Sequence, residues 1–390
     1  LVPVLIQMEH NGILLDTKSL SDYSQTLKTQ LGDLEKNIFK KADCEFNISS
    51  PKQLGEILFV NMKLVEKPKK TKSGQFSTSE SELAKLKGKH SIIDDILLFR
   101  TYQKLLSTYV NALPLLIDAK DKKLHTTFNQ TVTNTGRLSS KNPNLQNIPI
   151  RKSSGKDVRK TFIASNSQHI LMAADYSQIE LRLIAHLSDE SNLIQAFLND
   201  QDIHSITASK VFNVNLEDVT SEMRSNAKTV NFGIIYGVSA FGLSEQSTLS
   251  RKESANLISE YFIKYPKLKI YIDDQINFAK NNGFVQSILG RKRYLRNINS
   301  RNSFIRSHDE RNAVNMPIQG SAADIIKIAM ISIHQEFASR KMKSKMVLQV
   351  HDELVFDVFL PEKEEVMNIV KRKMESAYDA KVPLKVDIGF

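Results

Sequence analysis

Apolar and polar residues follow patterns that predict both strands and helices, and one short segment combines the two. Ile170 to Ala174 is an unbroken apolar run, and Asp175 follows it directly. Beyond Asp175, the apolar positions Ile179, Leu183 and Leu187 recur at the spacing of one helix face. The segment therefore predicts a buried strand that leads into a helix, with Asp175 at the junction. Two interpretations of Asp175 stay open: it caps the helix, or it holds a metal ion.

A second pair of apolar runs predicts a β-hairpin with acids at its tip. Met346–Val350 and Leu354–Val358 are both β-prone, and His351, Asp352 and Glu353 lie between them. His-Asp is not a pair that tight turns favour, so turn chemistry alone does not explain these residues. If Asp352 meets the aspartate of the first strand, the two carboxylates form an oxygen-rich site suited to Mg²⁺. Two metal ions in such a site would assist a phosphoryl transfer.

The remaining periodicity is mainly helical. Residues 1–120 and 183–305 are rich in apolar positions three or four apart, which is typical of amphipathic helices. Between residues 67 and 81 the chain is polar and basic, which predicts a mobile loop. The individual elements that we expect are helices over Thr17–Ala42, Pro51–Leu58, Ile92–Ile117, Ser321–Phe337 and Pro361–Tyr378, and a last strand over Pro383–Ile388.

One predicted helix carries a stripe of cationic and aromatic side chains. Arg224, Lys228, Phe232 and Tyr236 are spaced by four residues, so they lie along one side of the helix. Two cations one turn apart repel each other, so helix stability does not explain them. A triphosphate along the stripe would explain the cations, and a stacked base would explain the aromatic rings. The alternative is an amphipathic helix with its aromatic rings in the core and its cations in solvent.

Two further regions are dense in amides, hydroxyls and arginine. Thr135–Ser140 and Asn142–Pro149 contain few apolar residues, and Arg311, Asn315 and Gln319 recur every four residues. Asn, Gln and Arg are side chains that hydrogen-bond sugars and base edges. In the minor groove they meet acceptors that nearly all base pairs share, so such contacts test base-pair shape without reading sequence. A plain polar surface is the alternative.

Composition indicates a basic protein, and its cysteine content bears on the redox state of the compartment. The 390 residues carry a net charge of +11, which favours a polyanionic partner, with nucleic acid first. The single cysteine, Cys44, excludes an intrachain disulfide and cysteine-based zinc sites and favours a reducing compartment. We find no apolar run of the length expected for a membrane span, and the start does not read as a signal peptide. Because the chain begins with Leu1 rather than Met, we expect a fragment of a longer protein.

These segments together resemble the family A DNA polymerases of the bacterial DNA polymerase I type. Three motifs carry the resemblance, namely Asp175–Arg182, the Arg224–Gly237 helix and Gln349–Glu353. The blocks Thr135–Pro149 and Arg311–Gly320 fit as well, and all five blocks occur in the expected order. The match extends over the whole chain and resembles a polymerase large fragment without an exonuclease domain, so we expect no proofreading by this chain.

The resemblance implies an α+β fold arranged like a right hand, with an antiparallel-sheet palm, helical fingers and a helical thumb. The implied divisions are a palm-associated N-terminal segment over 1–17, the thumb over 18–116, the first part of the palm over 117–180, the fingers over 181–305 and the second part of the palm over 306–390. The implied activity is template-directed extension of a primer 3′-hydroxyl with dNTPs, releasing pyrophosphate, in DNA replication and repair. The implied partners are primer–template DNA and dNTPs. We expect a monomer away from membranes, in the cytoplasm of a bacterium near the nucleoid or in an organelle.

The resemblance also implies roles for the residues of the catalytic centre. Asp175 and Asp352 would hold two Mg²⁺ ions together with the Tyr176 carbonyl, and Glu353 would be a nearby, less essential acid. Lys228 would contribute to catalysis as well as to dNTP binding. The implied dNTP-binding residues are Ser177, Gln178, Glu180, His204, Arg224, Lys228, Phe232 and Tyr236.

Two of these nucleotide-binding residues imply specificity, and a further set implies DNA contacts. Glu180 is similar to the family's steric gate, which leaves no room for a 2′-hydroxyl. Phe232, where some relatives carry Tyr, implies strong discrimination against dideoxynucleotides. The implied DNA-binding residues are Arg100, Lys104, Ser107, Arg137, Asn144, Gln146, Asn147, Arg311, Asn315, Gln319 and His351, with the Lys70–Thr78 loop.

Three other activities share parts of this pattern. A single-subunit RNA polymerase has similar palm carboxylates and a similar fingers helix, but it lacks a blocking side chain such as Glu180. A catalytically silent DNA-binding module would gain nothing from two converging acids. A nuclease could use the same two metal ions, but it would not need the stripe of cations for a triphosphate.

Overall fold

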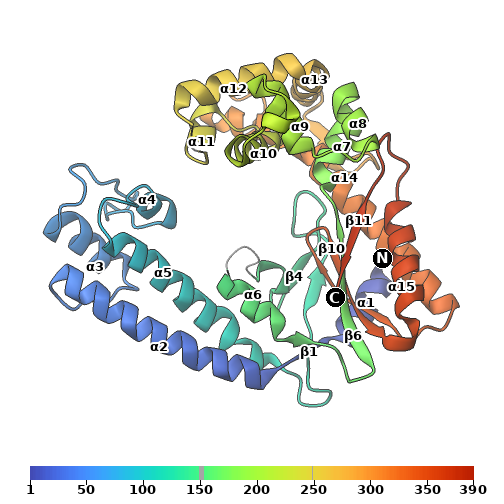
Figure 1. The fold of residues 1–390 in the computed structure, drawn as a ribbon, viewed down its shortest axis with the longest axis horizontal. Helices are drawn as coiled ribbons and strands as arrows, with labels where there is room; N and C mark the ends of the chain where they lie inside the picture. The colour runs from blue at the N-terminus through green and yellow to red at the C-terminus, as the bar shows by residue number, and fades with distance from the viewer. Residues whose placement is uncertain (149–152, 248) are drawn as a thin grey trace. The chain divides into compact units, whose positions relative to one another are not determined.

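The protein, described here from a computed structural model, consists of two compact units (Figure 1). The structure describes residues 1–148, 153–247 and 249–390, so Pro149 of the predicted polar block lies outside the described residues. The larger unit comprises Leu1–Asn11, Thr127–Lys141 and Ala164–Phe390, and the smaller unit comprises Gly12–Thr126 and Asn142–Ile163.

The smaller unit is organised around a pair of packed helices. Helix α2 spans Thr17–Ala42 as predicted, because Asp16 caps its first turn and its apolar stripe is continuous. That stripe, with Leu27 and Ile38 fully buried, packs against α5 (Ile92–Leu105), and Figure 1 shows the two helices side by side. The other elements of this unit are β1 (Ile13–Leu15) between β2 (Lys123–Leu124) and β5 (Phe162–Ile163), helices α3 (Pro51–Glu56), α4 (Glu80–Ala84) and α6 (Ser153–Lys160), the π-helical turns η1 (Ile57–Asn61) and η2 (Leu106–Val110), and the 3₁₀ turns η3 (Leu113–Leu116) and η4 (Leu145–Asn147).

A four-stranded antiparallel sheet forms the centre of the larger unit. Its strand order is β11 (Val386–Gly389), β6 (His169–Tyr176), β10 (Glu353–Phe359) and β9 (Lys345–Val350). The register pairs Val355 with Ala173, and Met172, Leu354 and Phe356 are fully buried. Helix α15 (Lys363–Glu375) packs on β6, β10 and β11, and α1 (Val2–Asn11) packs on β9. The predicted β-hairpin and the strand before Asp175 are thereby confirmed.

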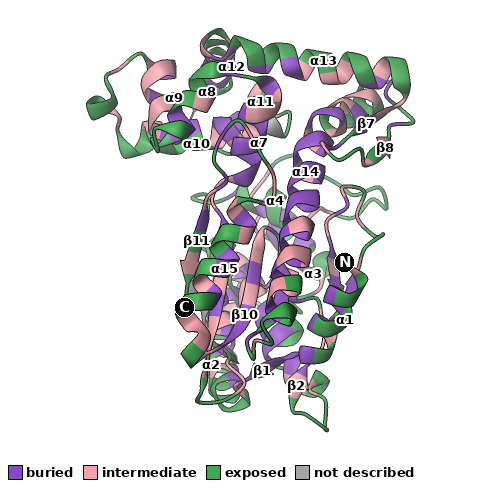
Figure 2. Cartoon of the chain, turned by 90° about the vertical axis from the view of Figure 1, so that its right-hand side faces the viewer, coloured by how far each residue is buried: buried purple, intermediate pink, exposed green. Residues whose placement is uncertain are grey.

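The longest helix of the larger unit is α14, which spans Ser303–Ser339. We expected a helix over Ser321–Phe337, and the predicted start was wrong. The helix instead begins where the Asn302 side chain caps it, and it continues through Pro317 in the buried core. By length and composition α14 could cross a membrane, contrary to our expectation, but 78% of its most apolar window is buried inside the protein. Figure 2 shows this burial along α14, so its hydrophobicity is that of a core helix.

The remaining elements of the larger unit are mostly helices that follow β6 in the chain. They are α7 (Ile179–Ser188), α8 (Ser191–Leu198), α9 (Ile203–Phe212), η5 (Leu216–Asp218), α10 (Ser221–Ile235), α11 (Ala240–Ser244), α12 (Arg251–Lys264), α13 (Pro266–Asn282) and η6 (Leu360–Glu362), with two small hairpins, β3 (Thr127–Asn129) with β4 (Ser139–Lys141) and β7 (Phe284–Gln286) with β8 (Lys292–Tyr294). This combination of antiparallel sheets and helices confirms the predicted α+β class. The division into palm, fingers and thumb stays a prediction.

Candidate active site

The position of Asp175 argues against one of its two interpretations, the helix cap. Asp175 lies near the C-terminal end of β6 and is exposed. The residue in the capping position of α7 is Gln178, which adopts a left-handed backbone conformation with φ of 53°. Ser177, between the strand and the helix, donates its backbone N–H to the Lys385 carbonyl at 2.8 Å. Asp175 therefore does not cap the helix, and it lies exposed at the end of the sheet.

The hairpin between β9 and β10 brings Asp352 to the same end of the sheet. His351 and Asp352 form its two-residue tip, and His351 has a left-handed φ of 56°. The backbone N–H of Tyr176 donates to the Asp352 carbonyl at 3.2 Å, while the Tyr176 ring is buried. Glu353 lies directly opposite Asp175 in the ladder. The two predicted acids, about 180 residues apart in sequence, are thus neighbours in the fold.

A further acid at this end of the sheet was not predicted. Asp387 on β11 lies opposite Asp175 on the other side of β6. Because directly opposed residues project from the same face of a sheet, Asp387, Asp175 and Glu353 form one row. Only the pairing of β11 with β6 reveals this, since the sequence around Asp387 shows an ordinary alternating strand.

The donor set here suits a hard cation that also binds substrate. Over residues 1–148, 153–247 and 249–390, no group of three or more His, Cys, Asp or Glu side chains is arranged to hold a metal ion. Mg²⁺ normally takes one or two carboxylates and completes its shell with water and substrate phosphates. The carboxylates of Asp175 and Asp352 fit that requirement, because oxygen is the only donor that they supply.

Next to these acids, Arg137 joins two carboxylates. Its guanidinium donates to Glu180 Oε1 at 2.7 Å and lies 3.6 Å from Asp352 Oδ1. Tyr236 donates its hydroxyl to the other oxygen of Glu180 at 2.5 Å. Burial raises the pKa of both Glu180 and Asp352, and Arg137 opposes that rise in each case. Arg137 is therefore the cation that offsets part of the cost of holding these two acids side by side.

The predicted stripe lies on α10, and its aromatic residues are not in the core. Arg224 is exposed and pairs with Asp202 through Nε at 2.6 Å. Burial would raise the pKa of Asp202, but hydrogen bonds from Arg224 and Ser205 lower it to about 2. Lys228 is exposed, and Tyr236 is 39% exposed at the end of the helix. The arrangement does not match the alternative of core aromatics, so the stripe needs another explanation.

His204 lies close to the stripe but beneath it. On α9 it is 2% exposed, its Nδ1 is 3.0 Å from the Asn231 amide nitrogen, and its ring centroid is 5.8 Å from that of Phe232. Burial, and then the nearby cations, lower the pKa of His204 to about 4 although Asp202 opposes this. His204 is therefore neutral at pH 7, and its ring packs against the ring of Phe232.

Helix α14 places the predicted arginine and amide residues beside Tyr236. The Arg311 side chain packs against Gly237, where a Cβ would lie 2.7 Å from the Arg311 Cγ. Gln319 hydrogen-bonds the Tyr236 hydroxyl. The side-chain oxygen of Asn315 is buried and, over the described residues, has no hydrogen-bond partner. One side of α14 thus faces the end of α10.

The other predicted DNA-binding residues belong to the smaller unit. Asn144, Gln146 and Asn147 form and cap η4, and Tyr109 donates to the Asn147 carbonyl at 2.6 Å. Arg100 donates to the carbonyl and the hydroxyl of Thr78, so it ties the predicted basic loop to α5. With Lys104 and Ser107 it lines a pocket of about 600 Å³.

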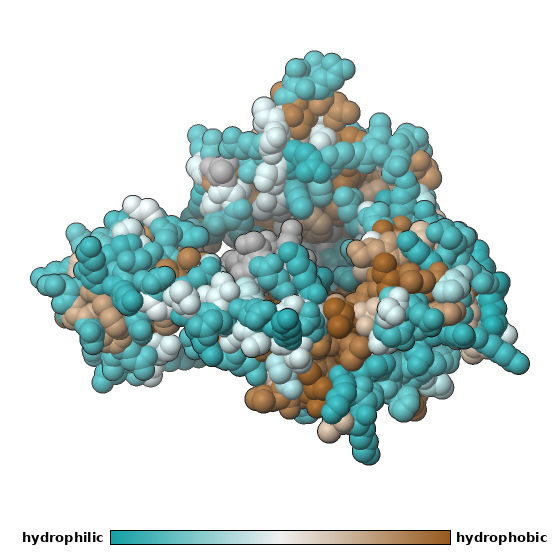
Figure 3. Space-filling view, turned by 60° about the horizontal axis from the view of Figure 1, so that its bottom comes forward, coloured by the Kyte–Doolittle hydropathy of each residue, from teal (hydrophilic) through white to brown (hydrophobic). Residues whose placement is uncertain are grey.

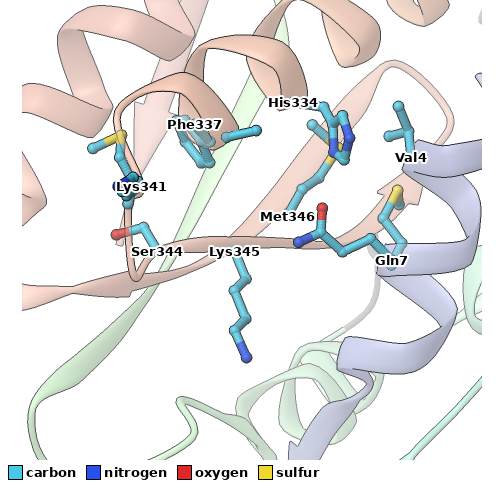
Figure 4. A pocket seen from close by; sticks show the side chains of 11 residues that line it. Val4, Gln7, His334, Phe337, Lys341, Ser344, Lys345 and Met346 are labelled. Carbon is cyan, nitrogen blue, oxygen red and sulfur yellow. The ribbon is translucent and has the colours of Figure 1, made fainter.

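Two further pockets lie in the larger unit. The face in Figure 3 is mostly hydrophilic, with separate hydrophobic patches. A basic pocket of about 550 Å³ runs between the loop before Arg137 and the β7–β8 hairpin. The pocket in Figure 4, about 120 Å³, lies between α1, the end of α14 and β9, where Val4, His334 and Met346 line it. None of the predicted site residues lines this last pocket, so it is separate from the candidate active site.

Comparisons with known proteins identify the family of the chain. The family model described as DNA polymerase family A matches residues 17–390. DNA polymerase I of Caldicellulosiruptor bescii is 49% identical over 388 residues, covering 100% of this chain and 45% of the relative. DNA polymerase I of Bacillus subtilis is 47% identical over 386 residues, covering 99% of this chain and 44% of the relative. The chain therefore spans less than half the length of these curated relatives.

A solved structure supports the same assignment. The POL domain of Pol1 from M. smegmatis, in complex with DNA primer-template and dNTP, superposes with a TM-score of 0.93 at 40% identity, covering 100% of this chain and 69% of that one. The match confirms the predicted resemblance and fold class. The chain therefore belongs to DNA polymerase family A, whose members are metal-dependent nucleotidyltransferases.

Proposed function

We propose that the chain is a template-directed DNA polymerase that extends a primer 3′-hydroxyl with dNTPs and releases pyrophosphate in DNA replication and repair. The observation that carries the proposal is the juxtaposition of Asp175 and Asp352 at one end of the sheet, beside the Arg137–Glu180–Tyr236 cluster. The relatives named DNA polymerase I and the structural neighbour with DNA primer-template and dNTP support it.

Asp175 and Asp352 would hold two Mg²⁺ ions, with the Tyr176 carbonyl as a further ligand. Bound there, the ions would lower the pKa of the primer hydroxyl and neutralise charge on the leaving pyrophosphate. The chain supports such binding in two ways. The Tyr176–Asp352 backbone hydrogen bond fixes the two strands relative to each other, and Arg137 opposes the rise in the pKa of Asp352 that burial causes. Glu353, opposite Asp175, would be an accessory acid.

The nucleotide would lie along α10. Arg224 and Lys228 would bind its triphosphate, Phe232 would pack on its sugar, and Tyr236 would lie beside the templating base. Lys228 would also meet charge that develops during the reaction. Ser177, Gln178 and His204 complete the proposed set of nucleotide-binding residues. Because His204 is buried against Phe232, its effect on the nucleotide would be indirect, through the position of the Phe232 ring.

Glu180 would exclude the 2′-hydroxyl of a ribonucleotide. It is held by two partners and is 7% exposed, so it cannot easily swing aside. This rigidity supports a deoxyribonucleotide substrate over the single-subunit RNA polymerase alternative.

Primer–template DNA would contact residues of both units. In the larger unit these are Arg137, Arg311, Asn315, Gln319 and His351, and in the smaller unit Arg100, Lys104, Ser107, Asn144, Gln146 and Asn147. The buried, unpartnered oxygen of Asn315 supports a role for this residue toward a donor that DNA supplies. We also propose that the chain acts as a monomer in the cytoplasm of a bacterium, without a membrane. Residues 18–116 would act as the thumb, residues 181–305 as the fingers, and the remainder as the palm.

Primer extension tests this function. A labelled primer on a recessed-end duplex is incubated with Mg²⁺ and either dNTPs or NTPs, with a chelator lane as control. Extension with dNTPs alone, abolished by the chelator, is expected. Equal extension with NTPs would favour the RNA polymerase alternative, primer shortening would favour a nuclease, and tight duplex binding without extension would favour a silent binding module.

A further inference from the structure

An ionic cluster with a buried carboxylate lies next to the loop that carries Arg137, and the sequence did not point to it. It consists of Ser287 and Arg291 from the β7–β8 hairpin and Asp324 and Lys327 from α14. Figure 2 shows β7 beside α14, in agreement with the contacts between them. None of these four residues belongs to the proposed metal, nucleotide or DNA-binding sets.

Asp324 is the centre of this cluster. It is 5% exposed, and Arg291 donates to its Oδ1 from Nε at 2.9 Å and from Nη2 at 2.7 Å. Ser287 donates its hydroxyl to the other carboxylate oxygen at 2.6 Å. Both oxygens are therefore occupied, and the guanidinium of Arg291 is held in one orientation.

Residues of the cluster contact the loop at Gly136, the residue before Arg137. Lys327, which is 8% exposed, donates its ammonium group to the Gly136 carbonyl. From another direction the Arg291 guanidinium packs on Gly136, because a Cβ there would lie 2.7 Å from the Arg291 Cζ. Gly136 also has a φ of +80°, which favours glycine. The backbone that leads into Arg137 is thus contacted by two cations, of which Arg291 pairs with Asp324 and Lys327 interacts with it electrostatically.

We propose that Asp324, with Arg291 and Lys327, is a positioning group that sets Arg137 between Glu180 and Asp352. The inference rests on the proposed polymerase function, because Arg137 matters only if those two acids serve substrate and metal. Arg137 reaches one acid at 2.7 Å and the other at 3.6 Å, so a small shift of its backbone would break the first contact and change the second.

Charge explains why Asp324 is needed for this arrangement. Burial and the positive charge of Arg291 both lower the pKa of Lys327, while Asp324 opposes them. Without the carboxylate, two cations would face each other next to Gly136 with no buried counter-charge, and Lys327 would move or lose its proton. Either response weakens the contact between Lys327 and the Gly136 carbonyl.

The test is a double-mutant cycle between Asp324→Asn and Arg137→Ala. Asparagine keeps the size of the side chain and removes its charge. We expect Asp324→Asn to lower kcat/KM for single dNTP insertion by about 10- to 100-fold, since small misplacements at an active site cost that much. In the Arg137→Ala background it should lower kcat/KM by no more than about threefold, because coupled residues are not additive.

Glu336→Gln is the matched control. Glu336 lies on the same helix and binds Arg340, Arg372 and Lys373, but it is 12 residues from Asp324, or roughly 18 Å along the helix. This variant loses comparable ion pairs and should keep wild-type kcat/KM. Thermal unfolding of each variant shows whether a loss of activity comes from unfolding of the protein or from displacement of Arg137 in a folded protein.

Several results would overturn the proposal. They are wild-type kcat/KM for Asp324→Asn, wild-type kcat/KM for Arg137→Ala, or a double variant whose loss is the product of the two single losses. If Asp324→Asn does not fold, Arg291→Gln replaces it in the same cycle with the same criteria, and Arg291→Lys should recover part of the activity. If the wild-type protein inserts no dNTP, the proposed polymerase function is wrong. This outcome differs from a failure of the positioning proposal, which would appear only in the variants.

Discussion

Replacing Lys228 with alanine tests the nucleotide-binding stripe more cleanly than any other change on α10. Lys228 is exposed, and within the described residues it makes no hydrogen bond or ion pair. Arg224, about 6 Å away along the helix, instead pairs with Asp202, so its removal would also leave a carboxylate unpaired. Loss of Lys228 should therefore change the free energy of unfolding by less than about 0.5 kcal/mol.

The effect on turnover should be far larger. A cation aimed at developing negative charge in an active site contributes about 2.7–4 kcal/mol, which corresponds to roughly 10²- to 10³-fold in kcat. The assay is single-turnover insertion of one dNTP at a saturating concentration, which reports the step after binding. Thermal unfolding in the same buffer checks that the fold is intact.

A matched variant controls for the loss of charge. Lys252→Ala removes an exposed lysine from α12 of the same unit and lowers the net charge equally. It should retain the wild-type insertion rate. If Lys228→Ala stays within threefold of wild type, or if Lys252→Ala slows insertion as much, the stripe is not the triphosphate site.

Two other predictions concern titrating groups. The folded-state pKa of His204, about 4, lies below its ordinary value of 6.5, so the protein should lose stability as the pH falls from about 6.5 to 4. Urea unfolding across that range should show the loss, which should be smaller in His204→Gln; an equal slope in both proteins would contradict the assignment. Burial raises the pKa of Asp352, so ionising it at neutral pH costs stability. Asp352→Asn should raise Tm by about 2 °C without divalent metal while abolishing extension, and a lowered Tm would contradict the sign of that cost.

Local signals in the sequence predicted elements that depend on local physics. Helix α2 has a capping aspartate and an uninterrupted apolar stripe, and its predicted bounds are those of the structure. The hairpin around His351 and Asp352 follows from two β-prone runs and a short polar gap. The start of α14 was not predicted, because the helix extends well beyond the apolar stretch Ser321–Phe337.

What the sequence could not show is which distant residues meet. Asp387 joins the acidic row only through the pairing of β11 with β6. Asp324 and Arg291 are 33 residues apart, and Lys327 and Gly136 are 191 apart, so no periodicity links them. Burial of His204 likewise depends on how α9 packs on α10. The types of residue in the site were predictable from motifs, whereas the contacts that position them depend on tertiary structure.

The most direct test of the central claim is the rate of dNTP insertion by Asp175→Ala, compared with wild type and with Asp274→Ala. Asp274 is an exposed carboxylate on α13 of the same unit, so its removal changes the net charge equally. If Asp175 and Asp352 together hold the catalytic metal ions, Asp175→Ala should lose at least about 10³-fold in insertion rate while Asp274→Ala keeps the wild-type rate. An Asp175→Ala protein that is folded, binds primer–template and inserts dNTPs within tenfold of wild type would contradict the account.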